Sequence, residues 1–218
     1  HKDRYDRVFI VSDSNVFPIY GELLHRIFVK YGVEPVGEYA FEAGEKSKTL
    51  ATVADIYKQF AASRLTRKSL AVALGGGVCG DMVGFAAATY LRGIDILQIP
   101  TTLLSQIDSS IGGKTGVDLD IGKNLVGAFW QPVAVIADSD FLKTLPERYL
   151  RDGMGEAIKY GCIADAELFS AIAEKRIAMS ELIGGCMKIK AAVVEADECE
   201  TGLRMILNYG HTLGHAVE

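Results

Sequence analysis

The chain has 218 residues, of which 49% are hydrophobic and 23% charged, and its formal net charge at pH 7 is −5. These values are typical of a globular protein with one large or two modest domains. The acidic balance leaves no basic stripe for nucleic acid, and no stretch approaches the roughly 18 consecutive apolar residues of a membrane span. Four cysteines without a CxxC pair favour reduced thiols, so we expect a cytoplasmic protein with neither nucleic acid nor membrane as a partner.

Strand and helix patterns alternate through the first half of the chain. Apolar runs predict strands at 7–12, 39–41, 69–74 and 94–100, and helical spacing predicts helices at 20–31, 47–60 and 82–90. This alternation is typical of a mostly parallel sheet with crossover helices. The pattern is helical from residue 148 onward, so we expect an α/β domain over 1–146 and an all-helical domain over 147–218. Both ends are abrupt, from which we expect a fragment of a longer protein.

A polar, glycine-rich run follows the strand expected at 94–100. Residues 108–124 read DSSIGGKTGVDLDIGKN and include Asp108, Lys114, Lys123 and Asn124 among several glycines. The run predicts a loop in which the backbone approaches a small anionic ligand, and its lysines form a positive island in an acidic chain. The alternative is a solvated linker, which single glycines without a Ser/Pro repeat disfavour.

Three glycines follow the apolar strand expected at 69–74. Gly75, Gly77 and Gly80 match G-x-G-x-x-G between a strand and a helix, the context of a Rossmann-like dinucleotide site. Such glycines let a pyrophosphate approach the backbone and rest on the helix N-terminus. Asp81, directly after them, would cap the helix, contact the ligand, or both. A Walker A loop ending in Lys114 is excluded, because Asp108 stands where its first glycine belongs.

The helical part carries two further polar patterns. Glu156 and Lys159 are spaced i, i+3, which fits a surface ion pair as well as a site. In an α-helix, Arg204, Asn208, His211 and His215 would form one stripe about 60° wide. Two histidines spaced i, i+4, with a glutamate elsewhere, are as consistent with metal ligands as with structural residues.

Several segments together resemble the 3-dehydroquinate synthase family, in order and through nearly the whole chain. They are GGGVCGD, ATYLRG, PTTLLSQIDSSIGGKTGVD, GKN, LPERYLRDGMGEAIKYG and ETGLRMILNYGHTLGHAVE. The resemblance implies an α/β NAD-binding domain on a helical metal-binding domain, a site in the cleft between them, and a homodimer. It implies NAD and a divalent metal, Zn²⁺ or Co²⁺, as cofactors. The implied shikimate-pathway reaction converts 3-deoxy-D-arabino-heptulosonate 7-phosphate, a sugar phosphate, to 3-dehydroquinate and phosphate.

The resemblance also assigns roles to individual residues. Those implied to hold NAD are Asp13, Asn15, Glu45, Lys48, Gly76, Gly77, Asp81, Thr101, Thr102, Lys123 and Thr144. Those implied to contact substrate are Arg92, Asp108, Lys114, Asn124, Lys159, Arg204, Asn208 and His215, with Arg92 reaching the neighbouring subunit. Glu156 and His211 are the implied metal ligands, and His215 is the expected proton shuttle.

The chain also departs from the family. The family's second metal histidine and a C-terminal lysine that contacts substrate have no counterpart here. Because catalytic zinc sites typically use three protein ligands, we expect this chain to be inactive alone.

Three other readings stay open. Metal-dependent alcohol and glycerol dehydrogenases share the expected architecture but would turn over NAD stoichiometrically. Other sugar phosphate cyclases, which make deoxyinosose or valiolone rings, would differ in only a few substrate contacts. A nucleotide-binding domain without catalysis would have lost polar residues that this chain retains.

Overall fold

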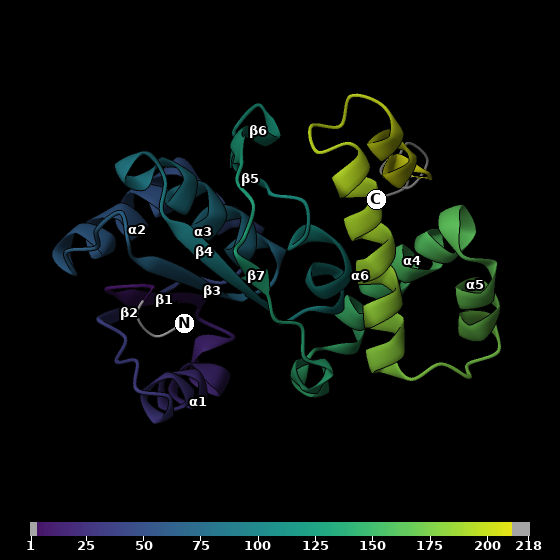
Figure 1. Ribbon diagram of the computed structural model, residues 1–218, viewed down its shortest axis with the longest axis horizontal. Coiled ribbons are helices and arrows are strands. Elements are labelled where there is room, and N and C mark those ends of the chain that lie inside the picture. Colours follow the sequence, from purple (N-terminus) through teal and green to yellow (C-terminus); the bar gives the residue numbers. More distant parts are fainter. Residues whose placement is uncertain (1–3, 211–218) are drawn as a thin grey trace.

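Residues 4–210 are described by a computed structural model, in which a five-stranded parallel sheet organises the first part of the chain (Figure 1). The strand order is β2-β1-β3-β4-β7, and each neighbouring pair is parallel. The strands are β1 (Val8–Asp13), β2 (Gly37–Phe41), β3 (Leu70–Gly75), β4 (Asp95–Pro100) and β7 (Ala134–Val135). The parallel α/β architecture expected from the sequence is confirmed.

Helices cover both faces of this sheet (Figure 1). On one face, α1 (Phe17–Lys30) packs against apolar side chains of β1, β3 and β4. On the other face lie α2 (Leu50–Ala62) and α3 (Gly77–Thr89). Successive residues of β1 therefore enter different cores: Ile10 faces the α1 side and Phe9 the α2 and α3 side. Burial on both faces explains why the strands read as continuous apolar runs.

Helix α3 begins at Gly77, earlier than the start predicted at residue 82. Gly77, Gly80 and Gly84 all lie within α3, which packs closely against its neighbours. A Cβ added at Gly84 would lie 2.4 Å from Cγ2 of Thr115. Asp81 lies inside the helix and does not cap it, because the N-cap is Gly76, so the capping role considered for Asp81 is wrong.

Residues 108–124 were predicted as a loop, and this prediction is wrong. Residues Ser105–Ser109 form a single π-helical turn (η3), and β5 (Lys114–Leu119) pairs with β6 (Gly122–Phe129) in an antiparallel hairpin. Gly116 serves close strand pairing opposite Gly127, whereas Gly112 and Gly113 lie in the segment before β5 with positive φ. A Cβ at Gly127 would lie 2.2 Å from the carbonyl oxygen of Thr115 across the hairpin.

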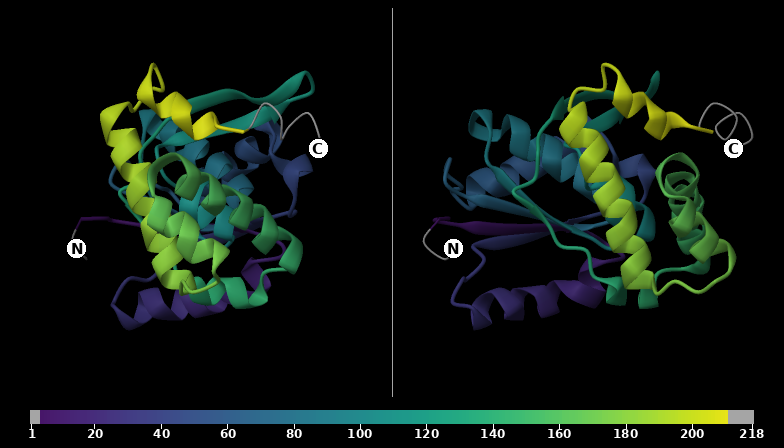
Figure 2. Two further views of the ribbon diagram at one scale, coloured as in Figure 1. Left: turned by 90° about the vertical axis from the view of Figure 1, so that its right-hand side faces the viewer. Right: turned by 45° about the vertical axis from the view of Figure 1, so that its right-hand side comes forward.

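Three α-helices form the rest of the structure: α4 (Glu147–Ala164), α5 (Ala166–Ala173) and α6 (Met179–Ala196). Helix α6 lies between the sheet and the other two helices (Figures 1 and 2). Their shared core includes Leu103 and Ile107, which follow β4 in the chain and so connect this core to the sheet. Helix α4 begins at the predicted domain boundary, and the division into two domains stays a prediction.

The chain after α6 differs from the continuous α-helix expected there. Residues 197–202 form a turn, and η5 (Leu203–Asn208) is a 3₁₀-helix. At three residues per turn, Arg204 and Asn208 are about 120° apart around the axis, so they share no stripe. Arg204 is buried and Asn208 is exposed. His211 and His215 lie outside the described residues.

Three further 3₁₀ turns join the elements within residues 4–210, namely η1 (Glu45–Ser47), η2 (Tyr90–Arg92) and η4 (Ser139–Thr144). None of the helices in this range has the length and apolar character needed to cross a bilayer.

Candidate active site

A cavity of about 620 Å³ lies between the β5–β6 hairpin, the start of α3 and the end of α6. Its wall includes Asp108, Lys114, Asn124 and Arg204, which were predicted to contact substrate, and Asp81, which was predicted to hold the cofactor. Residues far apart in the sequence thus meet around one space that is large enough for a small anionic ligand. Lys190 also lines it and was not predicted.

The carboxylate of Asp108 stands on η3 and is held by two donors. Its Oδ1 accepts a hydrogen bond from the Tyr160 hydroxyl at 2.7 Å and another from the Lys190 ammonium. Burial alone would raise the pKa of Asp108, but the charge and hydrogen bond of Lys190, with the Tyr160 hydroxyl, hold it below its ordinary value. The carboxylate is therefore ionised at neutral pH.

Lys190 has a signal in the sequence that could have found it. It lies on the buried stripe of α6, four residues after Cys186 and four before Val194. A lysine at a core position of an amphipathic helix needs a charged partner or a ligand. The pattern marks Lys190, but its partner, Asp108, is 82 residues away and could not be read from local spacing.

Glu156 and Lys159 form the ion pair that their spacing allowed. Lys159 is 8% exposed, and its ammonium also donates to the carbonyl oxygen of Leu207 at 2.8 Å. The pair is therefore buried, unlike the surface pair considered from the sequence. Of the predicted metal ligands, Glu156 is described and His211 is not. Within residues 4–210, no cluster of three His, Cys, Asp or Glu side chains could hold a metal ion.

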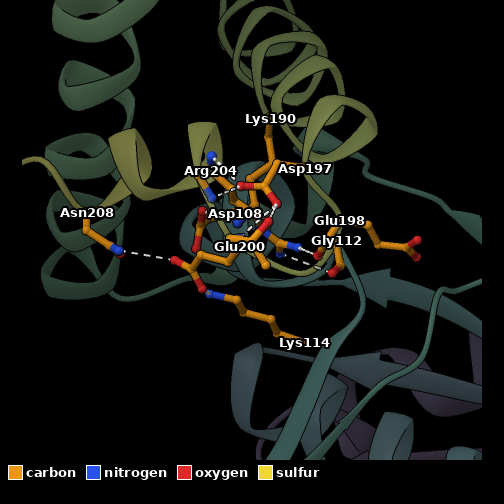
Figure 3. Close-up of polar contacts among 11 residues, drawn as sticks. Asp108, Gly112, Lys114, Lys190, Asp197, Glu198, Glu200, Arg204 and Asn208 are labelled. Atoms are coloured by element: carbon orange, nitrogen blue, oxygen red, sulfur yellow. Dashed lines mark hydrogen bonds and ion pairs between the residues drawn. The ribbon is translucent and has the colours of Figure 1, made fainter.

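The turn after α6 brings an acidic side chain next to Lys114, which lines the cavity (Figure 3). Glu200 pairs with Lys114 and accepts a hydrogen bond from Nδ2 of Asn208 at 3.1 Å. Hydrogen bonds from the backbone of the turn, Thr201 N–H foremost, lower the pKa of Asp197 to about 2 and fix the shape of this turn. The predicted substrate contacts Lys114 and Asn208 thus share one carboxylate.

Arg204 is 1% exposed and is oriented by backbone oxygens. Its guanidinium donates to the carbonyls of Gly112, at 3.0 Å, and Glu198, at 2.5 Å. These bonds join the turn after α6 to the segment that leads into β5 (Figure 3). Within residues 4–210 the hydrogen bonds of this guanidinium go to neutral carbonyl oxygens and not to a carboxylate, and Arg204 lines the cavity.

Five of the predicted cofactor residues lie at the carboxyl ends of parallel strands. Asp13 ends β1, Gly76 and Gly77 follow β3, and Thr101 and Thr102 follow β4. This edge is where open parallel sheets bind nucleotides. Asp13 also accepts from the backbone N–H of Asn15 at 2.9 Å, which folds the turn after β1.

Gly77 and Ser109 are in close contact at the start of α3. A Cβ at Gly77 would lie 2.9 Å from Oγ of Ser109, so a side chain there would displace this hydroxyl. Oγ of Ser109 is buried and makes no hydrogen bond within residues 4–210. A free hydroxyl beside the N-terminus of α3 is a suitable donor for an anionic oxygen. The residues present therefore fit the diphosphate of a dinucleotide.

Lys48 joins the cofactor side of the site to the hairpin. It is 4% exposed, and its ammonium lies 2.6 Å from Oδ2 of Asp81 and 2.6 Å from Oδ1 of Asn124. Burial raises the pKa of Asp81 to about 6, although Lys48 acts in the opposite direction. Because the Asn124 amide oxygen is held by Lys48, its Nδ2 remains available as a donor.

The remaining predicted residues lie outside the cavity wall. Lys123 and Glu45 form an exposed pair, with 3.8 Å between Nζ and Oε1. The hydroxyl of Thr144 is 2.7 Å from that of Tyr20. Arg92 is exposed at the end of η2, with a φ of 70°.

Comparisons with known proteins show the family of the chain. The model of the 3-dehydroquinate synthase N-terminal family matches residues 38–152, and that of the C-terminal family matches residues 153–218. The 3-dehydroquinate synthase of Clostridium acetobutylicum is 54% identical over 98% of this chain, and that of Geobacter metallireducens is 50% identical over 97%. The chain spans 61% of the length of both relatives.

The fold of the chain is also similar to that of solved structures. A 2-deoxy-scyllo-inosose synthase complexed with carbaglucose-6-phosphate, NAD⁺ and Co²⁺ matches with a TM-score of 0.89 and 32% identity, covering 99% of this chain and 62% of that one. An iron-containing alcohol dehydrogenase matches with a TM-score of 0.62 and 15% identity, covering 94% of this chain and 61% of that one, which shows the fold alone. The chain belongs to the 3-dehydroquinate synthase family.

Proposed function

We propose that the protein that carries this chain is a 3-dehydroquinate synthase. It converts 3-deoxy-D-arabino-heptulosonate 7-phosphate to 3-dehydroquinate and phosphate. The observation that carries this proposal is the cavity in which Lys114, Lys190 and Arg204 meet beside the glycine turn of Gly76 and Gly77. A substrate with a phosphate and a carboxylate needs several cationic donors, and this acidic chain gathers them at one place.

Two cofactors complete the proposed site. NAD would bind at the carboxyl ends of β1, β3 and β4, with its diphosphate at the start of α3, and would accept a hydride and return it within one turnover. Glu156 and His211 would hold a divalent metal, Zn²⁺ or Co²⁺, which would lower the pKa of a substrate hydroxyl. The 2-deoxy-scyllo-inosose synthase with NAD⁺ and Co²⁺, and a 2-epi-5-epi-valiolone synthase with NAD⁺ and Zn²⁺, support this pairing.

The described side chains then have distinct roles. The guanidinium of Arg204 and the ammonium of Lys190 would bind and orient anionic oxygens of the substrate. The ionised carboxylate of Asp108 would accept a hydrogen bond from a substrate hydroxyl. Nδ2 of Asn124, left free by its bond to Lys48, would donate to the substrate.

Proton transfer and assembly are part of the same proposal. His215 would move a proton near neutral pH, as its side chain is suited to do. The protein would be a cytoplasmic homodimer, in which Arg92 contacts substrate in the neighbouring subunit. Arg92 is exposed and does not line the cavity of its own chain, which supports this arrangement.

The test is phosphate release by the full-length protein with catalytic NAD⁺ and Zn²⁺ or Co²⁺. We expect phosphate from the heptulosonate phosphate without accumulation of NADH. Stoichiometric NADH with a polyol substrate would instead indicate a dehydrogenase. Glucose 6-phosphate is the matched competitor, because the 2-deoxy-scyllo-inosose synthase structure holds a carbocyclic analogue of it. Phosphate release from glucose 6-phosphate alone would replace the proposed substrate.

A further inference from the structure

Tyr160 has a position that none of the roles above uses. It lies on α4, its side chain is fully buried, and its hydroxyl donates to Oδ1 of Asp108 at 2.7 Å. Asp108 belongs to η3, 52 residues earlier in the chain. The contact therefore connects the helical part of the structure to a carboxylate at the cavity wall.

The same oxygen of Asp108 receives a second donor. The ammonium of Lys190, on α6, also bonds to Oδ1. Within residues 4–210 the hydrogen bonds to this carboxylate reach Oδ1 alone, and the residue lines the cavity. Two donors on one oxygen fix the rotation of the carboxyl group, so Oδ2 is left for a ligand.

The ring of Tyr160 makes a second contact with the site. The ammonium of Lys159 lies 4.7 Å from the ring centroid, a cation–π distance. Tyr160 therefore contacts two residues that are proposed to bind substrate, Asp108 through its hydroxyl and Lys159 through its face.

The hydroxyl keeps its proton whenever the protein is folded. Burial, and then the negative charge of Asp108, raises the pKa of Tyr160 far above its ordinary value. Around Asp108 stand Lys190 from α6, Lys159 from α4 and the carboxyl of Asp81 from α3. Of these neighbours, Tyr160 is the neutral donor, so its bond orients the carboxylate without changing the net charge of the site.

We propose that Tyr160 is a positioning residue, which holds the Asp108 carboxylate with one oxygen turned toward the substrate. This inference rests on the proposed function for its effect on turnover. The orientation and ionisation of Asp108 do not depend on that function, so they provide a separate measurement.

The experiment compares Tyr160→Phe with a matched control, Tyr57→Phe, in the full-length protein. Both changes remove one hydroxyl that makes a side-chain hydrogen bond, and that of Tyr57 goes to Thr89, away from the cavity. Carboxyl ¹³C NMR titration follows the pKa of Asp108 directly. We expect this pKa to rise in Tyr160→Phe, because a donor to the charged form is lost, and to stay unchanged in the control.

Phosphate release supplies the second readout. We expect kcat to fall by about 10- to 100-fold in Tyr160→Phe, the range typical of residues that orient a contact residue, and to keep its wild-type value in the control. In Asp108→Asn, adding Tyr160→Phe should cause little further loss, because Tyr160 acts through that carboxylate.

Three results would overturn the proposal: an unchanged Asp108 titration in Tyr160→Phe, an unchanged kcat, or a Tyr160→Phe protein that does not fold. The last would show that the hydroxyl is needed for stability. If the wild-type protein releases no phosphate from any substrate, the proposed function fails. The NMR titration still decides whether Tyr160 holds Asp108.

Discussion

Replacing Asp81 with asparagine should remove a pH-dependent loss of stability. The carboxyl is buried, which raises its pKa to about 6 even though the Lys48 ammonium lies 2.6 Å away. An ordinary aspartate titrates at 3.8. At about 1.4 kcal/mol for each pKa unit, keeping Asp81 ionised at pH 7 costs about 3 kcal/mol of folding free energy.

The sign of the effect follows from the two states. Below about pH 4 the carboxyl is protonated in both the folded and the unfolded chain, so it costs nothing. Between about pH 4 and 6 the unfolded chain releases the proton while the folded chain keeps it, so stability falls as pH rises. The amide of Asp81→Asn is neutral throughout, and its oxygen can still accept from Lys48. The variant should therefore lose less stability over this range.

Urea unfolding followed by circular dichroism, in steps from about pH 4 to 7, measures the difference. Other titrating groups contribute equally to both proteins, so subtracting the curves isolates Asp81. The control is Asp55→Asn, because Asp55 is 48% exposed and pairs with Lys58 on the helix surface. Parallel curves for Asp81→Asn and the wild type would refute the reasoning.

Three further changes test other parts of the site. Gly77→Val should abolish NAD⁺ binding in calorimetry, because the new Cβ would lie 2.9 Å from Oγ of Ser109. The control Gly184→Ala should bind NAD⁺ normally, because a Cβ at Gly184 meets no atom within 4 Å. Equal NAD⁺ affinities in the two variants would contradict this prediction. Glu200→Gln should bind inorganic phosphate about 2- to 5-fold more tightly, as expected for losing a partly exposed ion pair, and an unchanged affinity would show that Glu200 does not compete with anions. Lys159→Ala should lower the free energy of unfolding by about 1–3 kcal/mol, because the buried carbonyl oxygen of Leu207 loses its donor, and a wild-type value in urea titration would refute that role.

The sheet could be predicted from the sequence because its signals are local. β1 and β3 are buried on both faces, so each is a continuous apolar run in the sequence. The glycine motif after β3 likewise predicted a change from strand to helix, which the structure places at Gly76 and Gly77. In each case the pattern and the environment that causes it lie within a few residues of each other.

The hairpin could not be predicted, because glycine has several uses. Gly116 and Gly127 lie opposite each other, and β5 also packs against Gly84 of α3. These glycines admit close backbone contact, yet in the sequence they resemble a flexible loop. Nothing local distinguishes the two uses, since the contact that requires each glycine lies on another element.

The ion pairs at the cavity could not be predicted from the sequence either, and they change how an anion would bind there. The sequence predicts a positive island, whereas the structure pairs Lys190 with Asp108 and Lys114 with Glu200. These two lysines are therefore compensated before a ligand arrives, whereas the guanidinium of Arg204 donates to neutral carbonyl oxygens. To bind either lysine, an anionic substrate must exchange with a carboxylate. The side chain of Lys114 is 49% exposed, so its pair with Glu200 can separate into water. The side chain of Lys190 is 8% exposed, and its partner Asp108 is held by two donors, so Lys114 is the cation we expect to change partners first.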